Sequence, residues 1–515
     1  MSKLISRGLI PRSSLRLRGS SFGKSLSFLI VLFSIALAGK YYISPQGDDG
    51  AAGTGTIDAP FKTPQAAFSK MASGDTVYAR SGTYSLSAQV KPSKAGAETA
   101  RCKLWAYPGE KPVFDFTGLN DRGLYISKDS WHVRGIEVKN AGSNGICLSS
   151  GGNIVIEGCV SHDNGLEGIK LTGGAHDNLI LNCDSYRNYD AVNHGENADG
   201  FAAKSGIGTG NIFRGCRAWL NADDGWDFYG CPVTVTIDSC WAFRNGINVW
   251  NDAAFAGDGN AFKLGGAGDT AEHTITRSIA FDNAHNGFDQ NYNNAGQTMY
   301  NCTAFRNGTS NFSFYQTPTA GKLKKHMIKN SISYLGGAPN VDATALLQAN
   351  SWPSFTAGAS DFMSLDTALA LAPRNADYSL PKNGFLRLQG TSQFVDKGVI
   401  VGLSYSGKAP DLGAFETSGN AMINRDKGPG MGRKIAVSSI DGNRSFTLTI
   451  DIQSAASAVF SLVDITGKEV FGPVTVRLIR GNNAVPLRVA LAHGGFYLCK
   501  LTYGTESLFT RIVKN

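Results

Sequence analysis

Short runs of alternating apolar and polar residues, separated by Gly, Asn and Asp, occupy the middle of the chain. Runs such as NIVIEGCV (153–160) and VTVTIDSC (233–240) have the period of two and the flanking turn residues typical of short β-strands. One modest helix is expected over AAFSKMAS (66–73), where it would cap the first coil and shield its exposed edge. The pattern predicts an all-β body.

The predicted strands belong to a repeat. Six segments begin with Cys or Ser and place an Asn five positions later, and their starts are separated by 24, 33, 24, 38 and 24 residues. The pairs are Cys159/Asn164, Cys183/Asn188, Cys216/Asn221, Cys240/Asn245, Ser278/Asn283 and Cys302/Asn307. A fixed period of this size, with insertions in two coils, predicts a solenoid in which equivalent residues of successive coils lie roughly 4.8 Å apart.

Both repeated columns are interpreted as structural. The chain has nine cysteines, and five of them occupy the repeated position, so we expect buried thiols that pack as small apolar groups. The Asn column is expected to form a ladder of side-chain hydrogen bonds at the turns. We assign no catalytic role to either column.

A second register places charged residues on the outer surface. Each coil carries a step from a small residue to a large apolar one: Gly168-Ile169, Gly200-Phe201, Gly225-Trp226, Ala261-Phe262 and Gly287-Phe288. Strand alternation directs the large residue into the core and leaves the positions on either side of the step on the outer face. Asp199, Asp224 and Asp227 are therefore predicted to cluster, with Asp223 at the strand entrance and Lys263 one coil beyond Asp227.

Four carboxylates this close repel one another unless a cation lies among them. Oxygen ligands suit a hard cation, and Ca²⁺ tolerates irregular geometry better than Mg²⁺. A solvated acidic ladder without metal is the alternative. Beside a bound cation the pKa of Lys263 would fall, which favours a role as a base, whereas the nearby aspartates push its pKa upward.

Four segments closely resemble the family 9 polysaccharide lyases, pectate lyases on a right-handed parallel β-helix. They are DGFAAKSGIGTGN (199–211), NADDGWDFYG (221–230), GDGNAFKLGG (257–266) and HNGFDQN (285–291). The resemblance extends to the opening KYYISPQGDDG and the closing DLGAFE (411–416), so it covers about 380 residues. One departure is Ala261, where the family more often has glycine.

The resemblance implies the site residues. In that family four aspartates hold one Ca²⁺ and a lysine is the base, which by motif match gives Asp199, Asp223, Asp224 and Asp227 for the metal and Lys263 for proton abstraction. Lys263 would remove the C5 proton of a uronate while Ca²⁺ stabilises the charge that develops on its carboxylate, and loss of O4 would leave a 4,5-unsaturated product. Lys204, in the FAAK motif, is a candidate for binding substrate carboxylates.

Several alternatives remain open at this point. The Asp cluster could supply the acid and base of a hydrolase. The substrate could be rhamnogalacturonan or another uronate polymer instead of polygalacturonate. The protein could also be a non-catalytic β-helix for glycan binding or adhesion, because the fold alone does not imply catalysis. Such a protein would have no need for Lys263 in register beside the aspartates.

The amino-terminal segment predicts export. Lys3, Arg7, Arg12, Arg16, Arg18 and Lys24 precede the apolar stretch LSFLIVLFSIALA (26–38), which ends in a small-residue cleavage signal. We interpret residues 1–38 as a signal peptide of a secreted or surface-attached protein, and an uncleaved anchor is the alternative. This leader holds six of the 49 basic residues, which leaves 43 basic against 41 acidic side chains. The near-neutral remainder does not argue for nucleic acid as a partner.

The carboxy-terminal segment predicts a second unit. Residues 39–419 form the predicted β-helix domain, 420–434 a Gly-rich linker, and 435–515 a small antiparallel β-sandwich. The series LVDITGKEV, RGNNAVPL, GGFYLCKLTYG and RIVK resembles the sorting domain of the type IX secretion system, which implies the secretion machinery as a partner. A carbohydrate-binding sandwich is the competing interpretation. We expect a monomer that acts on an acidic polysaccharide.

Overall fold

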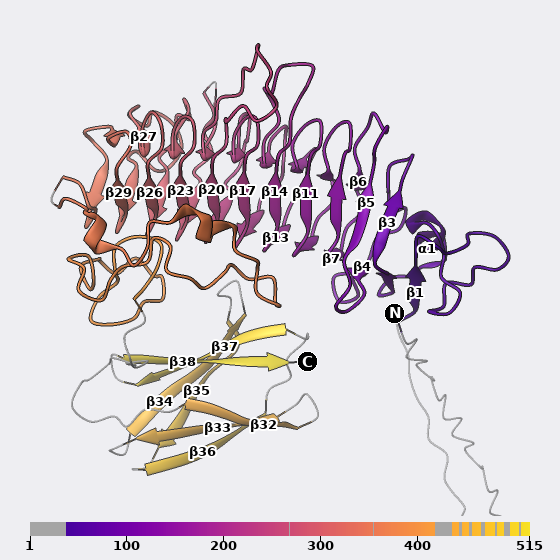
Figure 1. Ribbon diagram of the computed structural model, residues 1–515. Helices are drawn as coiled ribbons and strands as arrows, with labels where there is room; N and C mark the ends of the chain where they lie inside the picture. Colours follow the sequence, from indigo (N-terminus) through magenta and orange to yellow (C-terminus); the bar gives the residue numbers. More distant parts are fainter. Residues whose placement is uncertain are drawn as a thin grey trace, which may run out of the picture. The chain divides into compact units, whose positions relative to one another are not determined.

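The computed structural model describes residues 38–417, except 267 and 354, and seven strands between residues 435 and 514. In residues 38–417 the chain winds through three sheets in which every strand pairs in parallel with its neighbours, and successive coils stack along one axis (Figure 1). These residues therefore form a parallel β-helix, as the repeat predicted. We name the sheets A, B and C.

Sheet A has twelve strands. They are β1 (Lys40–Ile43), β2 (Thr76–Ala79), β4 (Cys102–Ala106), β7 (Trp131–Arg134), β10 (Val155–Glu157), β13 (Leu179–Leu181), β16 (Ile212–Arg214), β19 (Thr236–Asp238), β22 (Thr274–Thr276), β25 (Thr298–Tyr300), β28 (Met327–Lys329) and β31 (Leu346–Gln348).

Sheet B has ten strands. They are β3 (Gly82–Ser85), β5 (Pro112–Asp115), β8 (Glu137–Lys139), β11 (Val160–His162), β14 (Asp184–Tyr186), β17 (Arg217–Trp219), β20 (Trp241–Phe243), β23 (Ile279–Phe281), β26 (Thr303–Phe305) and β29 (Ile332–Tyr334).

Sheet C has nine strands and carries the candidate site. They are β6 (Leu124–Ile126), β9 (Ile146–Ser149), β12 (Ile169–Thr172), β15 (Phe201–Ala203), β18 (Trp226–Asp227), β21 (Phe262–Lys263), β24 (Phe288–Asp289), β27 (Phe312–Phe314) and β30 (Asn340–Val341).

The predicted core column forms an aromatic stack inside sheet C. Phe201, Trp226, Phe262 and Phe288 are fully buried, and the centroids of successive rings lie 4.5, 4.8 and 4.9 Å apart. Each ring comes from the strand next to the previous one, in the register that the Gly-aromatic steps predicted. Parallel pairing without register shift along this column keeps the outer column in line as well.

The Asn column forms the predicted ladder. The side-chain amide of each Asn donates to the side-chain oxygen of the Asn one coil further, at 2.8–2.9 Å. The eight cysteines whose side chains the structure describes are buried free thiols. Both columns are structural, as the sequence indicated.

Replacing Asn221 by Ala should destabilise the β-helix. Its side chain accepts from Asn188 Nδ2 at 2.8 Å and donates to Asn245 Oδ1 at 2.9 Å, so the change leaves buried polar groups unpaired on both sides. The free energy of unfolding should fall by about 1–3 kcal/mol in chemical denaturation. The control is Asn248→Ala in an exposed loop, with an expected change below about 0.5 kcal/mol; an equal loss in both variants would contradict the ladder's role.

The one α-helix among the described residues, α1 (Pro64–Lys70), begins and ends earlier than the predicted range 66–73. Thr63 caps its first turn by accepting a hydrogen bond from the Ala66 amide, and Pro64 occupies the first helical position, where no intrahelical donor is needed. Phe68 packs edge-on against Trp131, with ring centroids 5.2 Å apart. The helix thus covers the core near the first strands, as predicted.

Residues after β31 return across sheet B and contain two short 3₁₀ helices, η1 (Ala359–Asp361) and η2 (Thr367–Leu371) (Figure 1). Phe385 meets Phe281 of β23 at 4.8 Å between ring centroids. Asp184 of β14 lies 2.7 Å from both the Arg217 and the Arg374 guanidinium, which ties the returning segment to the sheet.

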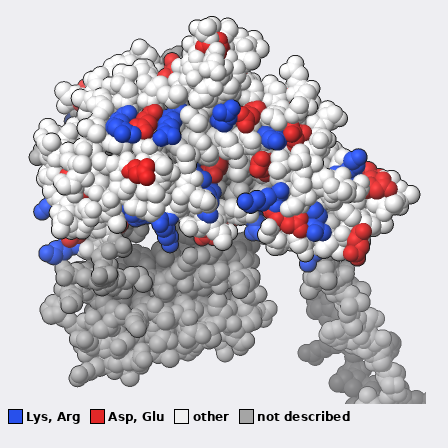
Figure 2. All heavy atoms as spheres, in the orientation of Figure 1, with Lys and Arg blue, Asp and Glu red and all other residues white. Residues whose placement is uncertain are grey.

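Figure 2 shows positive and negative side chains side by side across this face of the β-helix. Ion pairs at the strands of sheet B include Arg306–Asp282 at 2.8 Å, Arg187–Asp163 at 3.1 Å and Lys139–Asp115 at 3.6 Å. Charges of opposite sign compensate one another here, so this face has no extended area of one sign.

The carboxy-terminal segment contains seven antiparallel strands in a three-stranded and a four-stranded sheet, which confirms the predicted small β unit. They are β32 (Ile435–Asp441), β33 (Ser445–Ile452), β34 (Ala456–Asp464), β35 (Glu469–Leu478), β36 (Gly481–Arg488), β37 (Gly495–Tyr503) and β38 (Glu506–Lys514). The predicted linker and residues 1–37 of the predicted signal peptide lie outside the described residues, and the domain boundaries stay predictions. Within the described ranges, no helix has the length and apolar character needed to cross a membrane.

Candidate functional site

The candidate site lies on the outer face of sheet C, where strand pairing aligns one residue per coil. Lys170, Ala202, Asp227, Lys263 and Asp289 occupy paired positions on β12, β15, β18, β21 and β24. Asp199 and Asp224 stand at the entrances of β15 and β18, directly before the Gly step. Residues up to 64 positions apart in the sequence are therefore neighbours here, in the predicted register.

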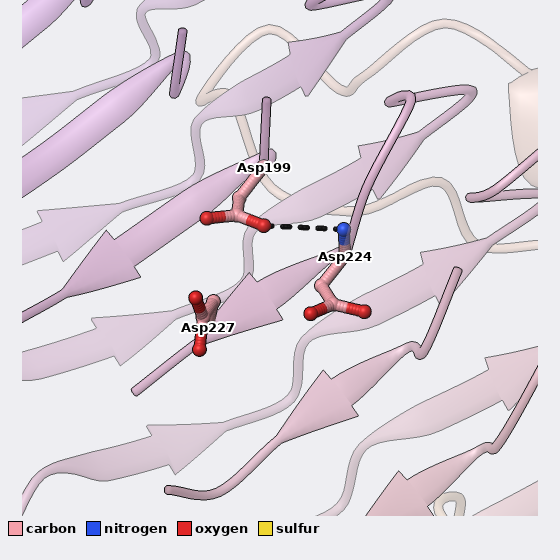
Figure 3. Close-up of side chains that lie close together, drawn as sticks. All are labelled: Asp199, Asp224 and Asp227. Atoms are coloured by element: carbon pink, nitrogen blue, oxygen red, sulfur yellow. Dashed lines mark hydrogen bonds between the residues drawn. The ribbon is translucent and has the colours of Figure 1, made fainter. Parts of the chain in front are cut away.

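Three of the predicted carboxylates come together. One oxygen from each of Asp199, Asp224 and Asp227 can be chosen so that all lie within 4.8 Å of one another. Figure 3 shows these side chains over adjacent strands, with Asp199 Oδ1 accepting a hydrogen bond from the Asp224 amide at 3.1 Å. All three are buried, which is unusual for acidic side chains without a compensating charge.

The inward oxygens of this cluster face lysine ammonium groups. Asp199 Oδ2 and Asp224 Oδ2 are buried and accept no hydrogen bond from the backbone. Lys204 Nζ lies 2.9 Å from Asp199 Oδ2 and 2.5 Å from Asp227 Oδ2, and Lys263 Nζ lies 3.1 Å from Asp224 Oδ2. Two ammonium groups thus partly compensate the charge of the three carboxylates.

The outward oxygens are fixed by the backbone. Asp224 Oδ1 accepts hydrogen bonds from the amide and the side chain of Asn260, at 2.7 and 2.9 Å. Asp227 Oδ1 accepts from the Tyr229 amide at 2.8 Å. Each carboxylate is therefore held by one oxygen while the other faces its neighbours, so the cluster is preorganised for a positive ligand.

Asp223 lies at the edge of the cluster. Its two oxygens accept from the Asn197 amide at 3.1 Å and the Asp258 amide at 2.8 Å. It shares a second acidic group with Asp224 and Asp258, whose oxygens also lie within 4.8 Å of one another. The structure places Asp223 beside Asp224, as predicted, but in a separate trio from Asp199 and Asp227.

Burial and mutual repulsion dominate the electrostatics. Burial raises the pKa of Asp199 and of Asp224, and the neighbouring aspartates add to the shift while the lysines oppose it. Burial by itself would lower the pKa of Lys204 and Lys263, but the surrounding carboxylates raise both pKa values above the usual range. The carboxylates and the two lysines are therefore each other's counter-charges in this arrangement.

The donor set fits a hard divalent cation such as Ca²⁺. The cluster offers only oxygen ligands, two of them buried atoms without a backbone hydrogen bond, and its oxygens already attract positive groups, because ammonium groups lie 2.5–3.1 Å from them. Asp199, Asp224 and Asp227 would hold such an ion, with Asp223 adjacent.

Two features of the site were not expected from the sequence. Lys204, predicted to contact substrate, points into the acidic cluster and also lies 3.6 Å from Glu167 Oε1. No role was assigned to Asp258. Its Oδ2 lies 3.2 Å from Lys263 Nζ, and its backbone amide donates a hydrogen bond to Asp223. Its position in the GDGN turn, five residues before Lys263, is the feature of the sequence that could have indicated this contact.

Comparison with known proteins agrees with this geometry. Residues 41–331 match the family model described as Pel9A-like, right handed beta helix region. Pectate lyase L of Dickeya dadantii (strain 3937) is 39% identical over 390 residues, which cover 73% of this chain and 90% of the relative.

Two solved structures superimpose on the chain. The crystal structure of pectate lyase Pel9A matches with a TM-score of 0.70 at 38% identity, covering 74% of this chain and 97% of that one. A rhamnogalacturonan lyase matches with a TM-score of 0.61 at 28% identity, covering 68% and 97%. The chain therefore belongs to the Pel9A-like right-handed β-helix family and is a polysaccharide lyase.

Proposed function

We propose that the protein is a secreted, calcium-dependent pectate lyase that cleaves polygalacturonate by β-elimination. The observation that carries the proposal is the position of Lys263, whose Nζ lies 3.1 Å from Asp224 beside the three-carboxylate cluster. An amine and a cation-binding cluster on one outer face are the two parts that elimination from a uronate needs. The relatives named as pectate lyases support this substrate.

The proposed reaction assigns one role to each group. Lys263, as the neutral amine, takes the proton from C5 of the uronate, and the C5–H electron pair forms the C4–C5 double bond. The C4–O4 bond breaks with its electron pair on O4, which takes a proton from water and leaves as a hydroxyl group. Asp199, Asp224 and Asp227, with Asp223, would hold Ca²⁺. When bound, Ca²⁺ supplies positive charge that stabilises the substrate carboxylate as negative charge develops on it.

The proposal accounts for the ion pairs in the cluster. Lys204 and Lys263 lie 2.9 and 3.1 Å from the carboxylates of Asp199 and Asp224, so their positive charges reduce the repulsion among the proposed ligands. A divalent ion among the aspartates would compensate their negative charge in place of the ammonium groups. Lys204 lies at the same cluster, and we include the predicted contact between Lys204 and a substrate carboxylate in the proposal.

The test is ultraviolet absorbance of the purified protein acting on polygalacturonate, with added Ca²⁺ and with chelator. We expect a rise in absorbance from the conjugated 4,5-unsaturated product with Ca²⁺, and its loss with chelator. Re-addition of Ca²⁺ is the control and should restore the rate. New reducing ends without absorbance would indicate hydrolysis and refute the proposal.

A rhamnogalacturonan backbone is the second candidate substrate. The observation in its favour is the similarity to a solved rhamnogalacturonan lyase at 28% identity. Elimination from either polymer gives an unsaturated product that absorbs in the ultraviolet. The same assay, run separately on each polymer, therefore shows which of the two substrates the protein cleaves. The signal peptide (1–38), the sorting domain (435–515) and a monomeric state remain part of the proposal; size-exclusion chromatography and mass spectrometry of the exported protein test them.

A further inference from the structure

The outer face of sheet C continues beyond Lys263 across three more strands, and we call this outer face the groove. Strand pairing aligns Lys263 with Asp289 on β24, Ser313 on β27 and Asn340 on β30. Neighbouring strands lie roughly 4.8 Å apart, so this path extends about 14 Å from the proposed base. A linear polysaccharide that crosses the strands at Lys263 would therefore place its next units over these positions.

This side of the groove contains a hollow of about 330 Å³, which we name the β24–β30 hollow. Its walls include Asp289, Tyr292, Thr309, Ser313, Tyr315 and Asn340. The volume lies within the range of small-molecule sites, roughly 300–1,000 Å³. It is thus large enough to be a binding site in its own right.

Two tyrosines give the β24–β30 hollow an aromatic wall. Tyr292 and Tyr315 are 56% and 39% exposed, and their rings meet edge to face with centroids 6.2 Å apart. Burial raises the pKa of Tyr315 to about 12, with Tyr292 and Asp289 adding to the shift, so its hydroxyl can donate a hydrogen bond. An exposed ring with a hydroxyl suits the apolar face and the hydroxyls of a sugar.

The hollow has no lysine or arginine among the described residues that line it. Apart from the tyrosines, its titratable wall residues are His285 and Asp289. Asp289 is buried; burial raises its pKa, while hydrogen bonds from the Asn291 amide, Ser313 and Asn286 oppose the shift. A uronate carboxylate placed here would lose hydration beside Asp289 without gaining a lysine or arginine partner, which is costly.

The opposite side of the groove has the reverse character. We define the β6–β12 surface by Lys91, Arg122, Tyr125 and Lys170. The cationic groups of Lys91 and Arg122 lie 4.9 and 5.5 Å from the centre of the Tyr125 ring. Lys170 follows two strands after Tyr125 in the same column.

Acidic partners only partly neutralise this surface. Glu167 lies 2.7 Å from Lys170, and Asp121 lies 3.8 Å from Arg122. Lys91 is exposed, and no carboxylate among the described residues pairs with it. The β6–β12 surface therefore has positive groups free for an acidic sugar.

We propose that the two sides of the groove bind different sugar units: the β6–β12 surface binds free uronates, and the β24–β30 hollow binds an uncharged unit. This inference rests on the proposed lyase function and specifies its substrate as a polymer in which uronates are followed by uncharged units. Methyl-esterified galacturonate and a neutral sugar share that chemistry.

The test compares kcat/KM on three polymers at equal Ca²⁺: fully de-esterified polygalacturonate, partly methyl-esterified polygalacturonate and a backbone in which galacturonate alternates with a neutral sugar. We expect the wild type to prefer one of the two polymers with uncharged units. Tyr315→Ala should lower kcat/KM about tenfold on that polymer and less than about twofold on the de-esterified one. The polymer that responds identifies which uncharged unit occupies the hollow.

Two further variants test the charge argument. Asn340→Lys places an ammonium group in the β24–β30 hollow and should raise kcat/KM on de-esterified polygalacturonate relative to the other polymers. Lys91→Ala, on the other side of the groove, should lower kcat/KM most on the de-esterified polymer. An equal effect of Tyr315→Ala on all three polymers, or an unchanged preference in Asn340→Lys, would overturn the inference.

Failure of the inference can be told apart from failure of the proposed function. Absence of the unsaturated product from every polymer would refute the lyase proposal alone. In that case, calorimetric titration with the corresponding oligosaccharides still tests the hollow. Tyr315→Ala should weaken binding of the oligosaccharide with uncharged units and spare the de-esterified one; equal affinities in wild type and variant would overturn the inference.

Discussion

Replacing Lys263 by Ala is expected to lower kcat by about a thousandfold, within the range that a general base contributes, roughly 10²–10⁴. Among the described residues, no other amine can replace Lys263 at this position on β21. The nearby Lys204 pairs with Asp199 and Asp227 on the other side of the cluster. Ca²⁺ affinity should be retained or increase, because the variant removes a positive charge 3.1 Å from Asp224. Initial rates by absorbance and calorimetric Ca²⁺ titration measure the two effects.

Lys263→Arg is the matched control for charge. The guanidinium keeps the positive charge next to Asp224 but does not deprotonate in proteins, so it cannot act as a base. We expect this variant to be as inactive as Lys263→Ala. Substantial activity in either variant would eliminate Lys263 as the base.

Replacing Asp227 by Asn should weaken Ca²⁺ binding by at least about a hundredfold, since even groups that only support metal ligands contribute about 10- to 100-fold. The amide keeps an oxygen for the Tyr229 N–H, so the turn after β18 should be preserved. Activity at limiting Ca²⁺ should fall by a similar factor and recover in part at high Ca²⁺. Calorimetry and rate measurements over a series of Ca²⁺ concentrations give both values.

Asp282→Asn is the control for loss of a carboxylate elsewhere on the β-helix. Asp282 pairs with Arg306 at 2.8 Å on the face of sheet B and has no contact with the cluster. Its Ca²⁺ affinity and activity should equal those of the wild type. If Asp227→Asn also bound Ca²⁺ with unchanged affinity, the cluster of Asp199, Asp224 and Asp227 would not be the metal site.

Sheet C was predictable from the sequence because its repeat is strict. The Gly-aromatic steps placed Phe201, Trp226 and Phe262 in the core and aligned Asp227 with Lys263, as observed. With parallel pairing and two-residue alternation, the position of a residue in the repeat determines the face on which it lies and its neighbours in the adjacent coils. Neighbours that are distant in the chain can therefore be predicted. The Asn ladder followed from the same regularity.

The sequence did not predict the contacts that depend on irregular segments and long side chains. Lys204 follows the last strand residue of β15, and its four-carbon stem could point outward or into the cluster; the buried carboxylates of Asp199 and Asp227 determine that it points inward. Asp258 reaches Lys263 from an inserted loop that the repeat does not describe.

The sequence by itself determined the β-helix, its register and which acidic residues share a face with Lys263. The tertiary structure alone decided how the charges in that face are paired, how the returning segment covers sheet B, and that a hollow with two tyrosines and no lysine or arginine in its walls lies beyond Lys263. A periodic backbone fixes positions by local rules, whereas ion pairs, loop paths and hollows depend on burial and on electrostatic interactions between segments that no local pattern relates.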